Sequence, residues 1–468
     1  MASVAFCTLG CKVNQYETDV MRERFLEAGY EIRDFEQEAD IYVINTCTVT
    51  NIADRKSRQM LRRARKRNPQ ALVIAAGCYV DTTQEALAGE RIADLLIGNK
   101  EKERIVEIVS RQLGVADPAD IIPGESTEGV CPDPDKRFTV GLVKGAGERL
   151  RSHIKIQDGC NQFCSYCAIP LARGRVVSRR QEDIAAEAAR LAAQGCPELV
   201  LTGIHISSYG LDLIDKSALN TNQRKEPGQG YGEDYGPFAG DALISLIEET
   251  ARVCGDIRIR LGSLEPRIIT DSFLQRLSAV KQVCPHFHLS LQSGCGETLK
   301  RMNRHYSPAL YLEKCDLIRK YYDFPAITTD VIVGFPGETQ EEFEETLAFV
   351  QKVGFSNMHI FRYSRRDGTR AASMSGQVDP RIMAERSQKL IEAAARMRRS
   401  FMEDQKGKEA EVLIEEMTDT PEGLMAAGYS RNYLRCVFSE QGLVPGMLVK
   451  GKIHKIFTEN IAFCKEIH

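Results

Sequence analysis

Short apolar runs alternate with helix-length segments twice along this chain of 468 residues. In the first series the apolar runs cover residues 3–7, 41–45, 71–77 and 92–98, with amphipathic stretches between them. Strands that are separated by helices pair in parallel, because each helix returns the chain to the same edge of the sheet. We therefore expect an N-terminal α/β domain, residues 1–115, built on a doubly wound parallel sheet.

The second series contains six apolar runs and predicts a central domain over residues 139–380. The runs cover residues 153–157, 198–203, 258–263, 286–291, 328–335 and 357–364. Six βα repeats predict a partial (β/α)6 barrel, since a complete barrel has eight. The polar, Gly-rich stretch 207–240 interrupts the series and is expected to be a surface insertion.

The remaining segments differ in texture from both series. Residues 116–138 are rich in Pro, Gly and Asp without periodicity, which predicts a linker. Residues 381–404 predict a connecting helix. Residues 405–468 contain short apolar runs joined by Gly, Pro, Asn and Asp, which is typical of a small all-β barrel.

The charge balance and the cysteine content exclude some classes of protein. Sixty-two Lys and Arg against 65 Asp and Glu give a net charge of -3, so there is no global attraction for nucleic acid. We expect neither a membrane span nor a secretory signal, and hence a cytoplasmic protein, because no long apolar run or basic leader occurs. The 15 cysteines are then core residues, reactive thiols or metal ligands rather than a disulfide framework.

The densest cysteine motif is Cys160-Asn-Gln-Phe-Cys164-Ser-Tyr-Cys167, directly after the first strand of the second series. Three thiolates on one loop can bind three corners of a cubane iron–sulfur cluster and leave the fourth iron open for a substrate. In barrels, the loops after the strands form the face where chemistry takes place. A structural zinc site is the alternative, but such a site requires four ligands, and the nearby His153 and His205 are not at finger spacing.

Three further cysteines are far apart in the sequence. Cys11, Cys47 and Cys78 each follow the carboxyl end of one of the first three major strands predicted in the N-terminal sheet. Open α/β sheets bind ligands at that edge, so the three thiols can converge on one site. Buried free cysteines are also common, and the residues alone leave both readings open. Most of the other cysteines are expected in the core, with Cys295 near the barrel mouth.

These residues resemble a known family. The CxxxCxxC motif, with the aromatic Tyr166 before its last cysteine, resembles the radical S-adenosylmethionine (SAM) enzymes. Cys11, Cys47 and Cys78 in TLGC, NTC and AGC contexts, together with the C-terminal β module, resemble the methylthiotransferases of that class, whose last domain is an RNA-binding TRAM domain. TLGCKVNQYETD and LTGIHISSYG are similar to the branch that modifies N6-threonylcarbamoyladenosine next to the tRNA anticodon.

The resemblance implies two 4Fe-4S clusters and SAM as cofactors. Cys160, Cys164 and Cys167 would hold the cluster that binds and cleaves SAM, and Cys11, Cys47 and Cys78 would hold an auxiliary cluster that carries the transferred sulfur. SAM would serve as methyl donor and as radical source, and the product would carry a methylthio group on C2 of the adenine. Expected cofactor contacts are Tyr166, Gly203, Glu265, Gln292 and Arg304, although the last three face the same mouth and are equally suited to the tRNA base.

The expected partners are the anticodon stem-loop of tRNA and an electron donor, and the chain is expected to be a monomer. Because the net charge is slightly negative, RNA must be bound by local patches, for which Arg431, Arg435, Lys450 and Lys452 are the candidates. The basic run 55–67 offers a second cationic face. Two other readings remain: a methylthiotransferase for isopentenyladenosine or for a ribosomal protein, and a non-catalytic iron–sulfur or zinc protein that binds RNA.

Overall fold

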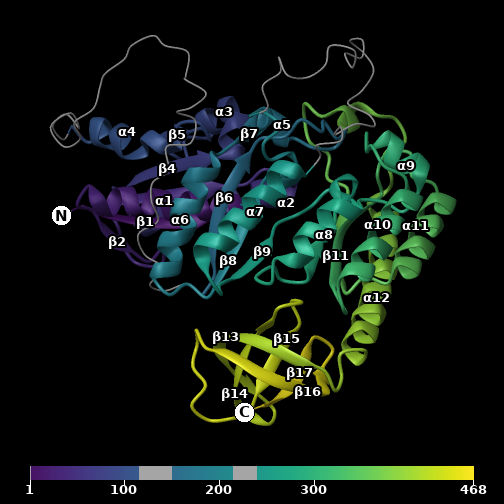
Figure 1. The fold of residues 1–468 in the computed structure, drawn as a ribbon. Coiled ribbons are helices and arrows are strands. Elements are labelled where there is room, and N and C mark those ends of the chain that lie inside the picture. The colour runs from purple at the N-terminus through teal and green to yellow at the C-terminus, as the bar shows by residue number, and fades with distance from the viewer. Residues whose placement is uncertain (1, 115–149, 214–239, 468) are drawn as a thin grey trace. The chain divides into compact units, whose positions relative to one another are not determined.

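The computed structural model of the chain describes residues 2–114, 150–213 and 240–467 (Figure 1). These residues form two compact units. Unit 1 contains the described parts of Met1–Gly145 together with Asp158–Arg179 and Ser364–Thr369, and unit 2 contains those of Ala146–Gln157, Arg180–Tyr363 and Arg370–His468. The predicted linker 116–138 and most of the predicted insertion 207–240 lie outside the described residues. None of the described helices is long and apolar enough to cross a membrane.

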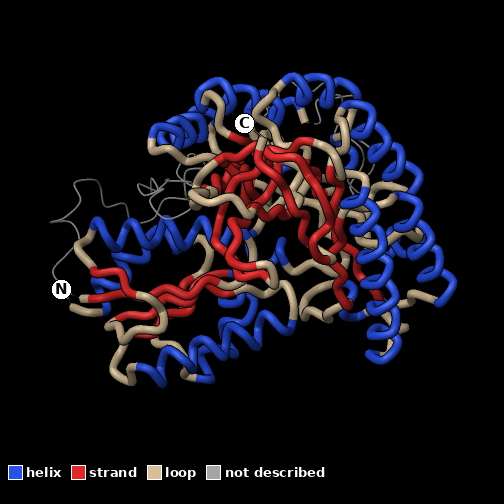
Figure 2. Tube along the Cα trace, turned by 90° about the horizontal axis from the view of Figure 1, so that it is seen from below, coloured by secondary structure: helices blue, strands red, loops and turns tan. Residues whose placement is uncertain are grey.

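Unit 1 is built on the predicted parallel sheet, which has the strand order β2-β1-β3-β4-β5. Its strands are β1 (Ser3–Thr8), β2 (Glu31–Arg33), β3 (Ile41–Thr46), β4 (Leu72–Gly77) and β5 (Leu95–Ile97). All six residues of β3 are buried, as expected for the central strand of a sheet covered on both faces. Figure 2 shows these strands between two layers of helices.

Each face of this sheet has its own apolar core. On one face, Leu61 of α2 (Asn51–Arg67) and Val80 of α3 (Cys78–Glu90) pack with Ile44. On the other face, Phe25 of α1 (Lys12–Glu27) and Val109 of α4 (Ile105–Gln112) pack with Val43. Neighbouring residues of one strand point to opposite faces, so a single apolar run supplies both cores. The helix α5 (Ile169–Arg173) also belongs to unit 1.

Unit 2 contains the predicted partial barrel of parallel strands. Its strands in chain order are β6 (Ser152–Asp158), β8 (Glu198–Gly203), β9 (Arg258–Leu261), β10 (His286–His288), β11 (Ala326–Val333) and β12 (Asn357–Arg362). Parallel ladders join β6 to β8 and β9, and join β10 to β11 and β12. Isolated parallel bridges, including Leu264 with Leu289, continue the sheet across the two groups.

Helices cover this sheet and share one large core with its strands. They are α6 (Gln181–Ala193), α7 (Asp241–Cys254), α8 (Asp271–Ala279), α9 (Gly296–Arg301), α10 (Pro308–Tyr321), α11 (Gln340–Val353) and α12 (Pro380–Glu403). Helix α11 starts with a complete capping box, in which Thr339 and Glu342 each bond to the other's backbone N–H. The predicted fold class is therefore confirmed for this region, whereas the domain boundaries remain predictions.

The C-terminal strands close into the predicted small β-barrel, in the order β13-β14-β15-β17-β16. They are β13 (Glu409–Thr420), β14 (Gly423–Ser430), β15 (Arg435–Phe438), β16 (Leu448–Thr458) and β17 (Ile461–Glu466). Buried and exposed residues alternate along the first part of β16, so one side of that strand faces the barrel core and the other faces solvent. A Cβ on Gly428 would lie 1.9 Å from the Leu413 carbonyl oxygen, so only glycine fits there.

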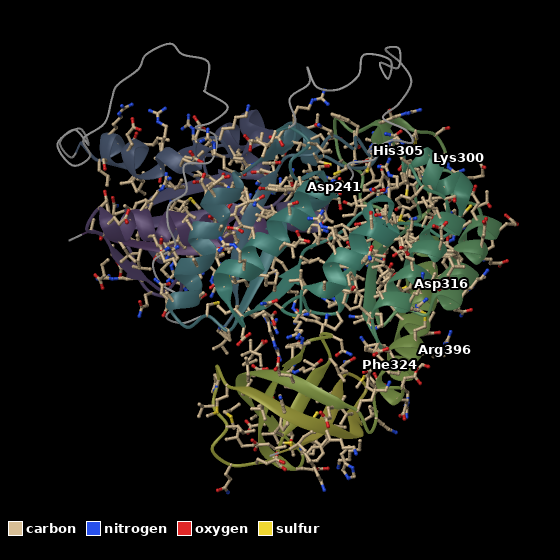
Figure 3. The ribbon with its side chains drawn as sticks, in the orientation of Figure 1. Asp241, Lys300, His305, Asp316, Phe324 and Arg396 are labelled. Atoms are coloured by element: carbon tan, nitrogen blue, oxygen red, sulfur yellow. The ribbon has the colours of Figure 1, made fainter. Side chains whose placement is uncertain are left out.

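Buried charges join this small barrel to the amino ends of the parallel strands. Arg260 of β9 donates to Glu198 of β8 over 2.7 Å and to the Arg431 carbonyl over 3.0 Å. The Tyr433 ring stacks on His286, with 4.7 Å between ring centroids. Phe324, which lies just before β11, marks this end of unit 2 in Figure 3.

Replacement of Glu198 by Gln should destabilise unit 2. Burial opposes ionisation of Glu198, but bonds and charges from Arg260, Arg151 and Arg258 outweigh it and lower its pKa below the usual value. Loss of a partner from such a buried set costs about 3–5 kcal/mol in the free energy of unfolding, measurable by denaturant titration. Because the folded pKa is lowered, this stabilisation is present at neutral pH and is lost as the pH falls through the acidic range.

The matched control is Glu297→Gln, since Glu297 forms an exposed ion pair with Lys300 over 2.6 Å. That change should leave the unfolding transition almost unaffected, because exposed pairs contribute little. Equal, small effects of the two substitutions would contradict the role given to Glu198.

Candidate metal centres and cofactor site

Cys11, Cys47 and Cys78 all lie at one edge of the unit 1 sheet. Cys47 directly follows β3, Cys78 begins the helix after β4, and Cys11 caps the helix after β1. The strands β1, β3 and β4 are adjacent, and Thr46 is paired in register with Gly77. The residues after these two, Cys47 and Cys78, therefore leave neighbouring strands at the same level.

The turn before Cys11 is packed closely against Cys47. Gly10 has φ +98°, and a Cβ built on it would lie 2.7 Å from the Cys47 Sγ, so this turn requires glycine. Cys47 is buried, and burial raises the pKa of its thiol to about 11, with smaller contributions from Cys78 and Cys11. The close packing of Gly10 against the Cys47 sulfur places the turn that carries Cys11 beside Cys47.

Two nitrogen donors bond to the Cys78 sulfur. Arg173 Nε donates over 3.2 Å and Asn99 Nδ2 donates over 3.4 Å. The side chain of Arg173 is 0% exposed, and its other nitrogens bond to Glu17, Asp158 and Asn14. Sequence patterns did not single out Arg173 or Asn99, because neither belongs to a spaced motif. Their only sequence signal is position, shortly after Cys167 and shortly after β5.

The CxxxCxxC loop belongs to the same unit and is partly exposed at all three cysteines. The Cys160 N–H donates to the Gly174 carbonyl over 3.1 Å, and the Cys167 N–H donates to the Cys164 carbonyl over 3.0 Å. The Gln162 N–H donates to the Cys160 sulfur over 3.4 Å. These hydrogen bonds hold the short segment that carries the three thiols in a turn. Tyr166 is half-buried within this turn.

A second arginine ties the segment after β12 to unit 1. Arg366 is buried and donates to Asn51 over 2.7 Å, to Asp54 over 2.6 Å and to Thr48 over 2.6 Å. Thr48 is the residue after Cys47. No sequence pattern indicated this contact, because ion pairs between residues some 300 positions apart leave no periodic signal.

In unit 2, Gly203 closes β8 where no side chain fits. A Cβ there would lie 2.9 Å from the Gln157 carbonyl oxygen and 2.9 Å from Ile206 Cγ2. The Gln157 side chain accepts a hydrogen bond from the backbone N–H of His205 over 2.8 Å. Burial, together with the charges of Arg304 and Arg267, lowers the pKa of His205 to about 3, so its ring is neutral.

Glu265, Gln292 and Arg304 also lie at or after the carboxyl ends of unit 2 strands. Glu265 is buried and accepts a bond from Arg267 Nε over 2.7 Å, and burial raises the pKa of its carboxyl group. Gln292 has φ +70°, and its N–H donates to the Asp330 carbonyl over 2.8 Å. Arg304 Nε donates to the Tyr306 hydroxyl over 3.1 Å. In Figure 3 the neighbouring His305 lies at the end of unit 2 opposite Phe324.

The four candidate RNA-binding residues differ in their surroundings. Arg431 donates to the carbonyls of Lys281 and Val283, and Arg435 forms an ion pair with Glu416 over 2.5 Å. Lys450 and Lys452 are exposed on β16, and neither forms an ion pair with a described residue. Five arginines of the basic helix α2 share only three carboxylates, those of Glu36, Glu90 and Asp94, so these ion pairs leave the helix cationic.

The donor sets fit iron–sulfur clusters. Each set supplies three thiols, which is one fewer than a closed four-cysteine site requires and would leave one iron of a bound cubane without a cysteine. Among the described residues, no group of three or more His, Cys, Asp and Glu is arranged to hold a metal ion. In a cubane each thiolate binds a different iron, so its ligands surround a cluster rather than one ion.

Two protein families and a solved structure match parts of this chain. Residues 154–350 match the radical SAM superfamily, and residues 3–98 match an "Uncharacterized protein family UPF0004". The fold resembles that of the radical SAM methyltransferase TsrM from Kitasatospora setae, with a TM-score of 0.53 and 15% identity over 80% of this chain and 77% of that one. The partial barrel and its cysteine loop thus define a radical SAM protein.

Full-length relatives narrow the family. The threonylcarbamoyladenosine tRNA methylthiotransferase MtaB of Bacillus subtilis is 39% identical over 97% of this chain and 94% of its own length. A tRNA-2-methylthio-N(6)-dimethylallyladenosine synthase of Bacillus licheniformis is 34% identical over 96% of this chain and 83% of its own. The chain belongs to the radical SAM methylthiotransferase family, in the MtaB group. The family's cofactors are SAM and two 4Fe-4S clusters.

Iron analysis separates the two proposed ligand sets. Anaerobic reconstitution should give about eight irons per chain, and about four in Cys164→Ala or in Cys47→Ala, because each set holds one cubane. The control Cys254→Ala should keep the full iron content, since Cys254 is a buried core residue of unit 2. A full iron content in Cys47→Ala would remove Cys47 from the ligand set.

Proposed function

We propose that this chain adds a methylthio group to C2 of the adenine in N6-threonylcarbamoyladenosine beside the tRNA anticodon. The observation that carries the proposal is the presence of two three-cysteine sets in one unit, one contiguous and one formed at the ends of adjacent strands. The base is assigned from the relatives, because those named for threonylcarbamoyladenosine are 35–39% identical, against 32–34% for those named for dimethylallyladenosine.

The two cysteine sets have different roles in the proposed reaction. When bound, SAM and the two clusters supply the methyl group, the hydrogen-abstracting radical and the transferred sulfur. Cys160, Cys164 and Cys167 hold the cluster that binds SAM, and Cys11, Cys47 and Cys78 hold the auxiliary cluster. The polypeptide contributes binding, orientation and the exclusion of competing reactions. The buried positions of Cys47 and Cys78 suit this last task, because they keep water from two of the three auxiliary ligands.

The carboxyl ends of the unit 2 strands suit a zwitterionic cofactor. Gly203 ends β8 packed against Gln157 and Ile206, and the Gln157 side chain accepts a bond from the backbone N–H of His205. Arg304 supplies a permanent positive charge, and Glu265 an acidic group whose burial favours its protonated form. In our proposal these residues and Gln292 are the SAM contacts of unit 2. Tyr166 of the cysteine loop is proposed as a further SAM contact.

RNA is proposed to bind along β16 of the C-terminal barrel. Lys450 and Lys452 extend from the exposed side of this strand, and Lys452 is paired in register with Lys465 of β17. On its other side Lys452 is paired in register with Glu409 of β13. Lys450, Lys452 and Lys465 form the cationic surface that we propose for phosphate contacts. Arg431 and Arg435 are not part of this proposed RNA surface. Arg431 donates to the Val283 carbonyl, and Arg435 forms an ion pair with Glu416.

The remaining partners follow from the reaction. Reductive cleavage of SAM needs an electron donor, which we propose as a second partner beside tRNA. We propose that the protein acts as a monomer in the cytoplasm, where tRNA is modified.

Replacement of Cys11 should separate the two halves of the reaction. With an anticodon stem-loop that contains threonylcarbamoyladenosine, Cys11→Ala should still cleave SAM to 5′-deoxyadenosine but form no methylthio product, because Cys11 belongs only to the auxiliary set. Mass spectrometry of the nucleosides measures both outcomes. Loss of SAM cleavage in Cys11→Ala would point to a structural role for this cysteine. Methylthiolation of dimethylallyladenosine alone by the parent protein would reject the assigned base.

Replacement of Lys452 by Ala should weaken RNA binding in a salt-dependent way. Loss of one phosphate contact reduces the slope of log K against log salt by about 1, which filter-binding titrations can measure. The control is Lys352→Ala, which removes an exposed lysine from α11 and should leave the slope unchanged. Identical slopes for the parent and Lys452→Ala would exclude β16 from the RNA-binding surface.

A further inference from the structure

Arg173 is a buried charge of unit 1 with hydrogen bonds to four residues. Its side chain is 0% exposed, and its Nε donates to the Cys78 sulfur over 3.2 Å. Its Nη1 donates to Glu17 over 2.8 Å and to Asp158 over 3.0 Å, and its Nη2 donates to Asn14 over 2.6 Å and to Glu17 over 3.1 Å. These contacts engage all five N–H donors of the guanidinium group.

The partners of Arg173 connect the two cysteine sets. Asn14 and Glu17 lie in the first turns of α1, the helix that Cys11 caps. Asp158 ends β6, two residues before Cys160, and Arg173 itself ends α5, six residues after Cys167. One side chain is therefore bonded to Cys78, to the helix that follows Cys11, and to the residue from which the CxxxCxxC loop starts.

The bond to Cys78 is not needed to satisfy the charge of Arg173. Two carboxylates already neutralise this arginine, and Lys102 adds a further cation to the set through its 2.6 Å bond to Glu17. Neither cation requires a sulfur partner, yet Nε is directed at Cys78. Asn99 adds a neutral donor to the same atom. The Cys78 sulfur thus accepts two N–H bonds, one of them from a permanent cation.

We propose that Arg173 is a positioning residue for the auxiliary cluster. It holds the Cys78 thiolate towards iron and raises the reduction potential of that cluster. An N–H bond from a cation stabilises negative charge on sulfur, and a reduced cluster carries one more negative charge than an oxidised one. The effect is strong at this site because Arg173 and Cys78 are both buried, where charges are poorly screened. This inference rests on the proposed function, since it takes Cys11, Cys47 and Cys78 as ligands.

The test is a redox titration of the auxiliary cluster alone. Full-length protein that carries Cys160→Ala, Cys164→Ala and Cys167→Ala is reconstituted anaerobically, and its reduction is followed by electron paramagnetic resonance. Arg173→Gln should retain about four irons per chain and titrate at a more negative potential than the parent, with an altered resonance spectrum. Asn99→Ala should shift the potential in the same direction by a smaller amount, because it removes a neutral donor.

The matched control is Arg366→Gln. Arg366 is also buried in unit 1 and bonded to Asp54, but its donors meet oxygen atoms of Thr48 and Asn51 rather than a sulfur. It should shift the potential by less than Arg173→Gln does, because none of its donors bonds to a ligand sulfur. An Arg173→Gln cluster that titrates at the parent potential would overturn the inference and leave Arg173 as an ordinary buried ion pair. Absence of iron from the parent of this series would instead contradict the ligand set, and with it the proposed function.

Arg173→Lys keeps the inference testable if the glutamine variant does not fold. Lysine retains the positive charge for Glu17 and Asp158 but has no Nε–H in the guanidinium position. Its cluster should titrate below the parent potential, and a potential equal to that of the parent would count against the inference.

Discussion

Parallel strands in an open sheet all end at the same edge, and this constraint places three cysteines of unit 1 at one edge. The strands β1, β3 and β4 are neighbours, and each is followed within three residues by one cysteine. These cysteines need no contiguous motif, because the pairing of neighbouring strands places them at one edge of the sheet. In the CxxxCxxC loop, short spacing in the sequence keeps the cysteines close. The glycine at position 10 completes the arrangement, since any larger residue would meet Cys47.

Buried arginines hold distant segments of the chain together. Arg173 and Arg366 bond to residues near Cys78 and Cys47, and Arg260 joins the C-terminal barrel to the parallel strands. Each is paired with a carboxylate, as a buried cation must be. The planar guanidinium group can donate to several acceptors at once, which explains why arginine rather than lysine occupies all three positions.

The sequence predicted the elements whose apolar pattern is strong. The strand at 198–203 has the predicted bounds. It missed β2, which has three half-exposed or exposed residues, and β14, whose Gly and Ala residues have low strand propensity. The bonds of Arg173, Arg366 and Arg431 were not predictable either. They join residues more than 90 positions apart, and such contacts follow from the tertiary fold rather than from local pattern.

The central claim is that two separate sets of three cysteines each hold an iron–sulfur cluster with one open iron. Anomalous diffraction at the iron edge from crystals of the anaerobically reconstituted protein tests it most directly. The account predicts two iron clusters, one bonded to Cys11, Cys47 and Cys78 and the other to Cys160, Cys164 and Cys167, each with one iron that no cysteine binds. A single cluster, or zinc at either set, would contradict it.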